Sequence, residues 1–376
     1  MDWTAAIKQA LRTTSANLER FKDAYPHVSN GDGKYARMNQ TNWTEGFWSG
    51  ILWLSYEYSQ EPAFREAAER SVASFGRRLE QGNQLDHHDI GFLYSLSAKA
   101  QWIIEQDESA RELALRAADA LMRRWRPGPR LIQAWGAEGD PENGGRIIID
   151  CLMNLPLLYW AAEQTGDGRY AEIARAHAEK SRRFLVRGDD SSYHTFYFDP
   201  ETGDALRGGT HQGFRDGSTW TRGQAWGIYG FALAHRYYKA PEFLETSKRL
   251  ARYFIAHLPE DQVAYWDFDV PQEEGTPRDS SASAIAACGL LELAGQLPEA
   301  DPERHAFLAA AEQSMRSLVA RYFTAGHEAE EGLLRHGSYS VRSGASPDDF
   351  VIWGDYFFLE ALMRLDRGIP GYWYAR

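Results

Sequence analysis

The chain has 376 residues, a length that suits two average domains or one helical barrel with a large core. Its net charge is -12, and acidic and basic residues mix along the whole chain. The sequence therefore has no basic stripe for a phosphate backbone, and nucleic acid is not an expected partner. The two cysteines, Cys151 and Cys288, stand in apolar runs, which argues against a disulfide framework and excludes a zinc site built on cysteine.

The N-terminal segment MDWTAAIKQALRTTSANLERF carries charges in every helical turn and lacks the apolar run of a signal peptide. No later stretch of about 18 apolar residues follows that could cross a bilayer. We therefore expect a cytoplasmic protein with no membrane partner.

Amphipathic helices recur along the chain, with apolar residues at helical spacing and polar residues between them. Three of these helices have a proline in their first turn, where its missing N–H group would have no partner in the helix anyway. These prolines are Pro62, Pro241 and Pro302. The predicted surface helices span 3–24, 61–81, 107–125, 167–187, 241–258 and 301–323.

A nearly all-apolar helix follows each surface helix, which indicates burial on every side. The predicted inner helices begin at Trp43, His88, Asp150, Thr221, Ser280 and Trp353. Because each pair of helices needs its neighbours to bury its faces, the sixfold alternation predicts an all-α (α/α)6 barrel, with residues 1–376 as a single domain.

Long polar loops at 25–42, 126–149, 188–220, 259–279 and 324–352 all precede an inner helix. They should therefore gather at one mouth of the ring, with short strands at HTFYFD and VAYWDFDV. The chain has 13 tryptophans, which suit stacking on sugar rings, although core packing explains many of them equally well.

Two acids are expected at inner-helix N-termini that face this mouth, Asp89 in LDHHDIGF and Asp150 after three isoleucines. The alternative is that each merely caps its helix. Desolvation of Asp150 and a second carboxylate nearby would raise its pKa toward that of a general acid, against the pull of the helix dipole. A metal site on residues 86–89 is disfavoured, because consecutive helical residues point apart.

The fourth inner helix opens with GSTWTRGQAWG and follows RGGTHQG, which brings polar and aromatic side chains to the same mouth. Arg222 could pair with a substrate carboxylate, or form a salt bridge to one of the many acids. The sequence has no GxSxG, GxxxxGK or GxGxxG motif. It therefore does not resemble the common serine hydrolases, nucleotide-binding proteins or dinucleotide-binding proteins.

Long motifs, among them NWTEGFWSGILWL, LDHHDIGFLYSLSAKAQW, GGRIIIDCLMNLPLLYWA, GGTHQG and STWTRGQAWGIYGF, resemble the bacterial unsaturated glucuronyl hydrolases of glycoside hydrolase family 88. The resemblance runs from the first helix to GYWYAR at the end of the chain. It implies an (α/α)6 barrel, no metal or cofactor, and a small anionic oligosaccharide substrate that carries a 4,5-unsaturated glucuronic acid.

The resemblance also implies roles for particular residues. Asp150 matches the catalytic acid and base of the family, and Asp89 matches its second essential carboxylate. The positions that match the substrate pocket are Trp43, His88, Trp135, His194, His211, Gln212, Arg222 and Trp226. The loop 336–349 is expected to shape the subsite of the leaving sugar.

The implied reaction is hydration of a vinyl ether in polysaccharide catabolism such as glycosaminoglycan degradation, by a glycosidase expected to be a monomer. The alternatives are an unsaturated rhamnogalacturonyl hydrolase, a sugar epimerase on the same toroid, and a non-catalytic sugar-binding protein. An acidic chain that takes an anionic substrate also needs a locally positive region at its mouth.

Overall fold

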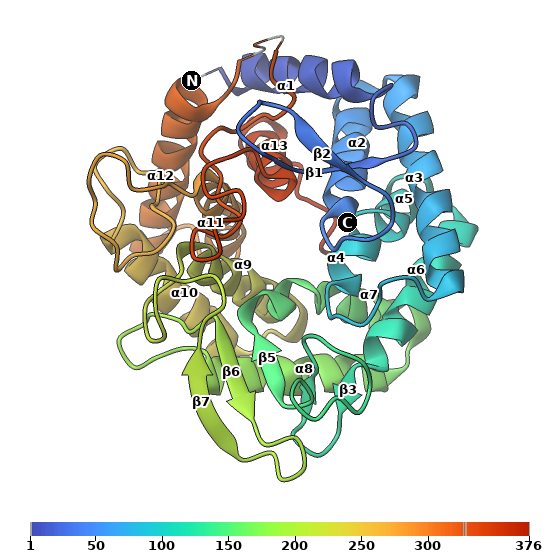
Figure 1. The fold of residues 1–376 in the computed structure, drawn as a ribbon, viewed down its shortest axis with the longest axis vertical. Helices are drawn as coiled ribbons and strands as arrows, with labels where there is room; N and C mark the ends of the chain where they lie inside the picture. Colours follow the sequence, from blue (N-terminus) through green and yellow to red (C-terminus); the bar gives the residue numbers. More distant parts are fainter. Residues whose placement is uncertain (1, 326, 328, 376) are drawn as a thin grey trace.

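The computed structural model describes residues 2–325, 327 and 329–375, and its helices form a double ring (Figure 1). The outer ring confirms the surface helices predicted from the amphipathic pattern. It consists of α1 (Trp3–Asn17), α3 (Pro62–Gln81), α6 (Glu108–Met122), α8 (Gly168–Phe184), α10 (Pro241–Ala256) and α12 (Pro302–Ser317), which runs on into the π-helical turn η2 (Leu318–Tyr322).

The inner ring contains the apolar segments, so the (α/α)6 fold class is confirmed. Two of its six members are broken. They are α2 (Glu45–Ser59), α4 (Ile90–Ser95) with α5 (Ala98–Glu105), the 3-10 turn η1 (Ile149–Met153) with α7 (Pro156–Thr165), α9 (Thr221–Tyr238), α11 (Ser280–Ala294) and α13 (Ile352–Arg367).

The break between α4 and α5 lies at Ser97, whose hydroxyl donates to the carbonyl of Leu93 at 2.6 Å. The backbone of Ser97 leaves the helical region there, with φ -114° and ψ -91°. A side chain that bonds back to its own helix competes with the regular ladder, which accounts for a kink that apolar periodicity does not reveal.

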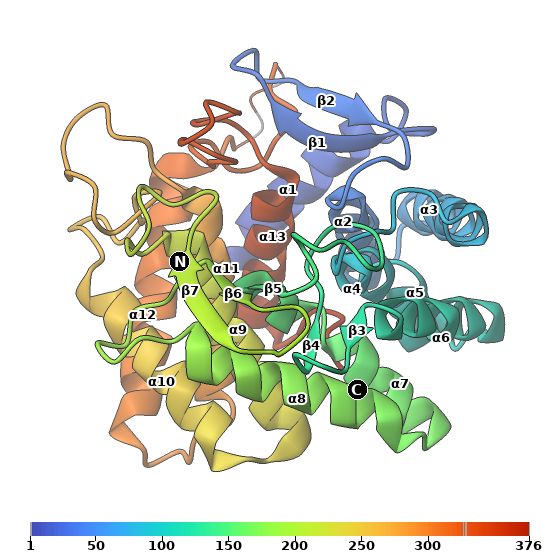
Figure 2. The ribbon, with the colours of Figure 1, turned by 60° about the horizontal axis from the view of Figure 1, so that its bottom comes forward.

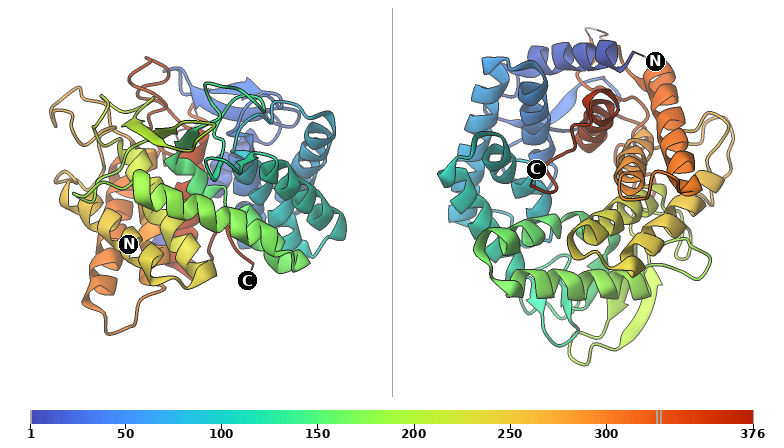
Figure 3. Two further views of the ribbon diagram at one scale, coloured as in Figure 1. Left: turned by 90° about the horizontal axis from the view of Figure 1, so that it is seen from below. Right: turned by 180° about the vertical axis from the view of Figure 1, so that it is seen from behind.

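Short antiparallel strands lie at one end of the ring (Figures 2 and 3). We call this end the mouth. They are β1 (Tyr25–Ser29) with β2 (Tyr35–Met38), β3 (Trp125–Arg126) with β4 (Leu131–Ile132), and a sheet of β5 (Arg146–Ile148), β6 (Thr195–Phe198) and β7 (Ala205–Gly209) in that order. HTFYFD thus supplies a strand, as predicted.

VAYWDFDV, in contrast, makes only isolated bridges, between Tyr265 and Arg278 and between Trp220 and Asp267. Its two bridging residues pair with different segments, so no continuous ladder forms and that prediction was wrong. The loops do meet as expected, since Asp349 accepts hydrogen bonds from the hydroxyl of Ser29 at 2.8 Å and from the backbone N–H of Gly31 at 2.6 Å.

The C-terminal segment enters the centre of the ring from the side opposite the mouth (Figure 3). Trp373 is 1% exposed and stacks on Phe357 of α13 with ring centroids 5.9 Å apart. Its carbonyl accepts a hydrogen bond from the buried ammonium of Lys99 at 3.0 Å. The aromatic core is therefore filled behind the mouth. Among the described helices, none is long and apolar enough to cross a membrane.

Candidate active site

Asp89 and Asp150 lie close together at the mouth, on neighbouring members of the inner ring. Asp89 directly precedes α4, but its side chain makes no capping hydrogen bond, so the alternative of a simple helix cap does not hold. Asp150 lies within η1 and not at the start of α7, which begins only at Pro156. Its side chain is 19% exposed.

Close backbone contacts position the turn that carries Asp150. A Cβ on Gly91 of α4 would lie 2.4 Å from Cα of Asn154, and one on Gly230 of α9 would lie 2.3 Å from Cβ of Leu152. Only glycine at both positions lets α4 and α9 approach the turn this closely. The glycines of the inner helices therefore serve the placement of the site as well as packing.

His88 joins the two carboxylates. Its Nε2 is 3.0 Å from Oδ1 of Asp150 and 3.5 Å from Oδ1 of Asp89. No aligned hydrogen bond links the imidazole to either acid, so these contacts are ion pairs between close atoms. Asn154 lies beside them, and its amide donates to Oδ1 of Asp89 at 3.4 Å and to the carbonyl of Asp150 at 3.3 Å.

Burial and neighbouring charges separate the protonation states of these groups. Burial raises the pKa of Asp150 above its ordinary value, although the charge of His88 opposes this. Burial also acts on Asp89, but the charge of His88, the hydrogen bond and charge of His87 and the amide of Asn154 together outweigh it and lower the pKa of that acid. Burial would lower the pKa of His88, yet the two carboxylates raise it well above its ordinary value. The environment thus moves the pKa values of the two acids apart, upward for Asp150 and downward for Asp89, as expected for a proton donor and a supporting carboxylate.

Ligand atoms of His88, Asp89 and Asp150 all lie within 4.8 Å of one another, a spacing that a metal ion could bridge. Such binding would require His88 to lose its proton, and the two carboxylates oppose this loss because they raise the pKa of His88.

His194 and His211 flank the strands β6 and β7 at the mouth. The buried Nδ1 of His194 accepts the backbone N–H of His211 at 3.0 Å, so its proton sits on Nε2. Burial lowers the pKa of His194 well below its ordinary value, so this imidazole is neutral. His211 is exposed, and its Nε2 lies 3.0 Å from the hydroxyl of Tyr197.

Arg222 is 1% exposed and fully engaged by protein groups. Its guanidinium pairs with Asp279 at 2.5 Å, donates to the carbonyls of Ser338 and Tyr339, and donates to Oε1 of Gln212 at 2.8 Å. The alternative of a salt bridge to an acid is therefore present. A direct contact of Arg222 with substrate stays a prediction, and its contact with Gln212 fixes the orientation of that amide.

The three predicted pocket tryptophans differ in accessibility. Trp43 is half-buried and stacks on Trp353 with ring centroids 5.3 Å apart, and Trp135 is half-buried beside the ring of His211 at 4.9 Å. Trp226 is 1% exposed and packs on Phe92 at 5.4 Å. The structure therefore does not bring Trp226 to the surface of the mouth. Its indole packs beneath that surface, against Phe92.

Sequence reasoning missed three residues of this region: Asn154, Asp279 and Arg146. Asn154 and Asp279 stand in the quoted motifs, but only their spatial partners, Asp89 and Arg222, reveal a role. Arg146 immediately precedes the isoleucine run, and its guanidinium lies 5.2 Å from the ring centroid of Trp135. The sequence did not predict the strand that carries Arg146, so nothing indicated that its side chain lies near Trp135.

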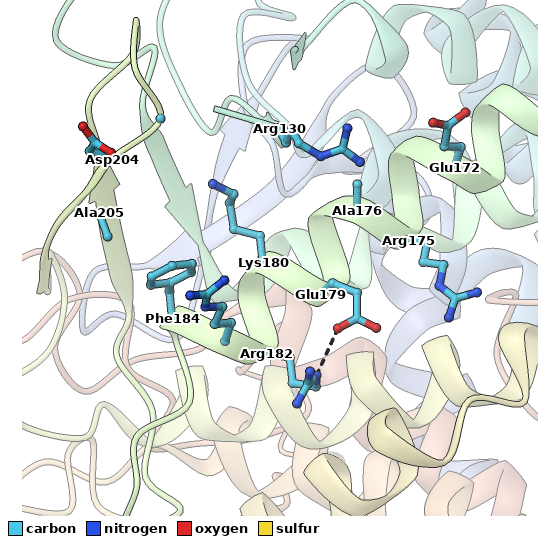
Figure 4. Close-up of a pocket in the computed structure, with 12 residues that line it drawn as sticks. Arg130, Glu172, Arg175, Ala176, Glu179, Lys180, Arg182, Phe184, Asp204 and Ala205 are labelled. Atoms are coloured by element: carbon cyan, nitrogen blue, oxygen red, sulfur yellow. Dashed lines mark hydrogen bonds and ion pairs between the residues drawn. The ribbon is translucent and has the colours of Figure 1, made fainter. Parts of the chain in front are cut away.

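A surface cavity of about 860 Å³ lies elsewhere, on the outer face of α8 against Gly203, Asp204 and Ala205 (Figure 4). It is lined by Arg130, Lys180, Phe184 and other residues, and it contains none of the predicted site residues.

An all-helical ring with paired carboxylates, a histidine between them and half-buried tryptophans at one mouth defines an (α/α)6 enzyme acting on carbohydrates. Residues 17–364 match Glycosyl Hydrolase Family 88, and the chain belongs to this family. It is accordingly a glycosidase, which confirms the resemblance seen in the sequence and sets aside the epimerase and the non-catalytic alternatives.

Similar proteins cover the whole chain. An unsaturated glucuronyl hydrolase of Bacillus sp. (strain GL1) is 66% identical over 374 residues, which span 100% of this chain and 99% of the relative. An unsaturated chondroitin disaccharide hydrolase of Streptococcus pyogenes serotype M1 is 44% identical and covers 99% of this chain and 93% of its own length. The crystal structure of the Bacillus sp. GL1 enzyme superposes with a TM-score of 0.98, at 66% identity and with 100% and 99% of the two chains covered.

Proposed function

We propose that this enzyme releases 4,5-unsaturated glucuronic acid from the non-reducing end of oligosaccharides left by polysaccharide lyases. The observation that carries the proposal is the contact of 3.0 Å between His88 and Asp150, beside Asp89, at the mouth of a family 88 ring. The reaction is the hydration of the C4=C5 vinyl ether, so the usual scheme of displacement at the anomeric carbon by two carboxylates does not apply.

In this proposal Asp150 is the proton donor. Its carboxylic acid protonates C4 of the double bond, and the electron pair of that bond forms the new C–H bond and leaves oxocarbenium character at C5. The resulting carboxylate then removes a proton from the water that adds at C5. The product is a hemiketal, which opens and releases the second sugar.

Asp89 and His88 prepare this step. The negative charge of Asp89 helps to keep Asp150 protonated, since it raises the pKa of that acid. The positive charge of His88 then stabilises the carboxylate that forms after proton transfer, which is where charge develops. The absence of an aligned hydrogen bond from the imidazole to Asp150 leaves the acid free to aim its proton at carbon.

Binding of the unsaturated sugar falls to the aromatic and amide groups of the mouth. The accessible face of Trp43 suits stacking on the planar unsaturated ring. The Oε1 of Gln212 accepts a hydrogen bond from Arg222, so the NH₂ group of Gln212 is left to donate to the substrate carboxylate. The Nε2–H group of His194 is a second donor for a substrate oxygen.

The similar proteins also support a class of oligosaccharides as substrates of this enzyme. One solved structure, of a UGL variant with dGlcA-Glc-Rha-Glc, is 65% identical to this chain, covers 100% of it and 99% of its own chain, and has a TM-score of 0.98. Taken with the chondroitin disaccharide hydrolase of Streptococcus pyogenes, it supports glycosaminoglycan-derived or gellan-derived oligosaccharides as substrates of this enzyme. We also infer that the enzyme is a cytoplasmic protein and a monomer. Light scattering on the purified chain tests the monomer, and cell fractionation tests the location.

The experiment is the variant Asp150→Asn, assayed by the fall in ultraviolet absorbance as the conjugated double bond of an unsaturated chondroitin disaccharide is lost. We expect normal folding and a decrease in kcat of at least about 100-fold, because the general acid is gone. Asp23→Asn, at an exposed position, is the matched control and should turn over substrate normally. Retained turnover in Asp150→Asn would remove Asp150 from the acid role.

A further inference from the structure

The sheet β5–β6–β7 carries two guanidinium groups on either side of one tyrosine. Arg146 of β5 pairs in register with Tyr197 of β6, which in turn pairs with Arg207 of β7. The guanidinium of Arg146 lies 4.9 Å from the ring centroid of Tyr197, and that of Arg207 lies 4.1 Å from it. Directly opposed residues share one face of a sheet, so both cations lie on the face of Tyr197.

Arg146 differs from the other deeply buried arginines of the described chain. Arg78 pairs with Glu45 at 2.7 Å, Arg222 pairs with Asp279, and Arg124 donates to backbone carbonyls. Arg146 is 8% exposed, and no described residue makes an ion pair with its guanidinium or a hydrogen bond to its Nε.

A buried cation without a counter-ion costs free energy, and its field is screened by salt less than that of an exposed one. Asp140 lies near enough for the charge of Arg146 to lower its pKa, but it forms no ion pair with the guanidinium, so the position keeps a positive potential.

A third arginine completes the group around His211. Arg342, on the loop 336–349, donates to the carbonyl of Thr210 at 3.3 Å, one residue before His211. Burial lowers the pKa of His211, and the charges of Arg146, Arg342 and Arg207 lower it further, against Asp216. Asp216 lies 3.9 Å from Arg207, which leaves the group with more positive than negative charge.

These residues lie away from the reacting atoms. The groups around Asp150 are His88, Asp89 and Asn154, and Arg146 contacts none of them. Arg146 precedes Asp150 by the length of β5, so their Cα atoms are separated by roughly 10 Å at the rise of a strand. In the proposed reaction the substrate carboxylate is attached to C5, next to the protonated carbon, and therefore ends beside Asp150.

We propose that Arg146, Arg207 and Arg342 form an electropositive entry site that captures the carboxylate of the anionic saccharide before it reaches Asp150. The proposal rests on the proposed function, and it supplies the local positive region that a chain of net charge -12 needs for an anionic substrate. Because the entry site acts on association, it raises kcat/KM and leaves kcat unchanged.

The test measures kcat and kcat/KM of the full-length enzyme for an unsaturated chondroitin disaccharide across a series of salt concentrations. For Arg146→Gln we expect kcat/KM to fall roughly 10-fold at low salt, kcat to stay within about twofold, and the loss to shrink as salt rises. Arg342→Gln, at an exposed position, should show a smaller loss of the same kind. Arg146→Lys keeps the charge and should recover most of the rate.

Arg183→Gln removes the same charge from the outer face of α8 and is the matched control. It should leave both constants unchanged. An equal fall of kcat and kcat/KM in Arg146→Gln, a loss that persists at high salt, or no loss at all would overturn the proposal. If the wild-type enzyme hydrolyses no unsaturated disaccharide, the proposed function fails. The entry site is then tested by calorimetry, where its prediction is a salt-dependent loss of affinity for the disaccharide in Arg146→Gln and an unchanged affinity in Arg183→Gln.

Discussion

The Nε2 atom of His88 lies 3.0 Å from Oδ1 of Asp150 without an aligned hydrogen bond between them. A positive charge this close stabilises the carboxylate form of Asp150, while burial stabilises the acid form. Burial prevails in this balance and raises the pKa of Asp150, and the positive charge of His88 is already in place for the carboxylate that forms afterwards. The same contact therefore serves both halves of the proposed cycle.

Loss of the His88 charge should shift the pH profile in a known direction. Asp150 must be protonated to react, so kcat/KM falls as pH rises through its pKa. Because the charge of His88 lowers that pKa, His88→Gln should move the falling limb to higher pH. It should also reduce the maximal kcat roughly 10-fold or more, since the stabilising cation is lost.

The measurement is kcat/KM against pH for both enzymes, with His305→Gln as an exposed control. A falling limb that stays in place or moves to lower pH in His88→Gln would contradict the assignment.

The buried pair of Arg222 and Asp279 should be strongly coupled. Asp279→Asn leaves the guanidinium without its counter-ion, so we expect a loss of about 3 kcal/mol in the free energy of unfolding. Arg222→Met combined with Asp279→Asn should lose less than the sum of the single variants, by at least about 1 kcal/mol. Urea unfolding of the four proteins measures this coupling. The control is the exposed pair of Arg316 and Glu312, 3.1 Å apart, which should give a coupling energy near zero. Equal coupling energies for the two pairs would contradict the prediction that burial strengthens the coupling of Arg222 with Asp279.

Asp355 should make stability depend on pH. It is 2% exposed, it accepts the hydroxyl of Tyr35 at 2.7 Å and the backbone N–H groups of Leu333 and Leu334, and burial raises its pKa to about 7. The folded state therefore holds this proton more tightly than the unfolded state. Its contribution is fully present below about pH 4 and is lost as pH rises toward 7, by roughly 4 kcal/mol in total.

Asp355→Asn removes this titration. The difference in free energy of unfolding between wild type and variant should therefore decrease from pH 4 to pH 7. Urea unfolding at several pH values measures it, with Asp23→Asn as the exposed control. A difference that is constant with pH, or that increases, would show that the folded state does not raise the pKa of Asp355.

Gly91 should tolerate no side chain. In Gly91→Ala the new Cβ would lie 2.4 Å from Cα of Asn154 and 2.5 Å from its carbonyl oxygen, so α4 and η1 must separate. We expect a loss of about 1–3 kcal/mol in the free energy of unfolding, as for overpacked cores. The rate should also fall, because Asp89 and Asp150 sit on the two separated elements.

Gly76→Ala is the matched control. Gly76 lies inside α3, and its Cβ would meet only Cδ2 of Leu113 on α6 at 3.7 Å, an ordinary van der Waals contact, so this variant should be equally or more stable. Thermal unfolding and kcat/KM of both variants test the pair, and a neutral Gly91→Ala would show that the close approach does not position the site.

The sequence by itself determined the ring and the two acids. Helical periodicity on the surface helices, apolar residues all round the inner ones, and their sixfold alternation are local properties of the chain, and they sufficed for the (α/α)6 fold. Asp89 and Asp150 stood out because each opens a buried apolar segment, where a carboxylate needs a reason to be present.

Only the tertiary structure decided which charges meet. Arg222 looked available in the sequence, yet Asp279, 57 residues further on, neutralises it. Arg146 carried no signal, yet it is the buried arginine without an acidic partner among the described residues. Pairing between distant residues follows from the closure of the ring and the register of short strands at its mouth. These depend on contacts between side chains far apart in sequence, which local periodicity does not encode.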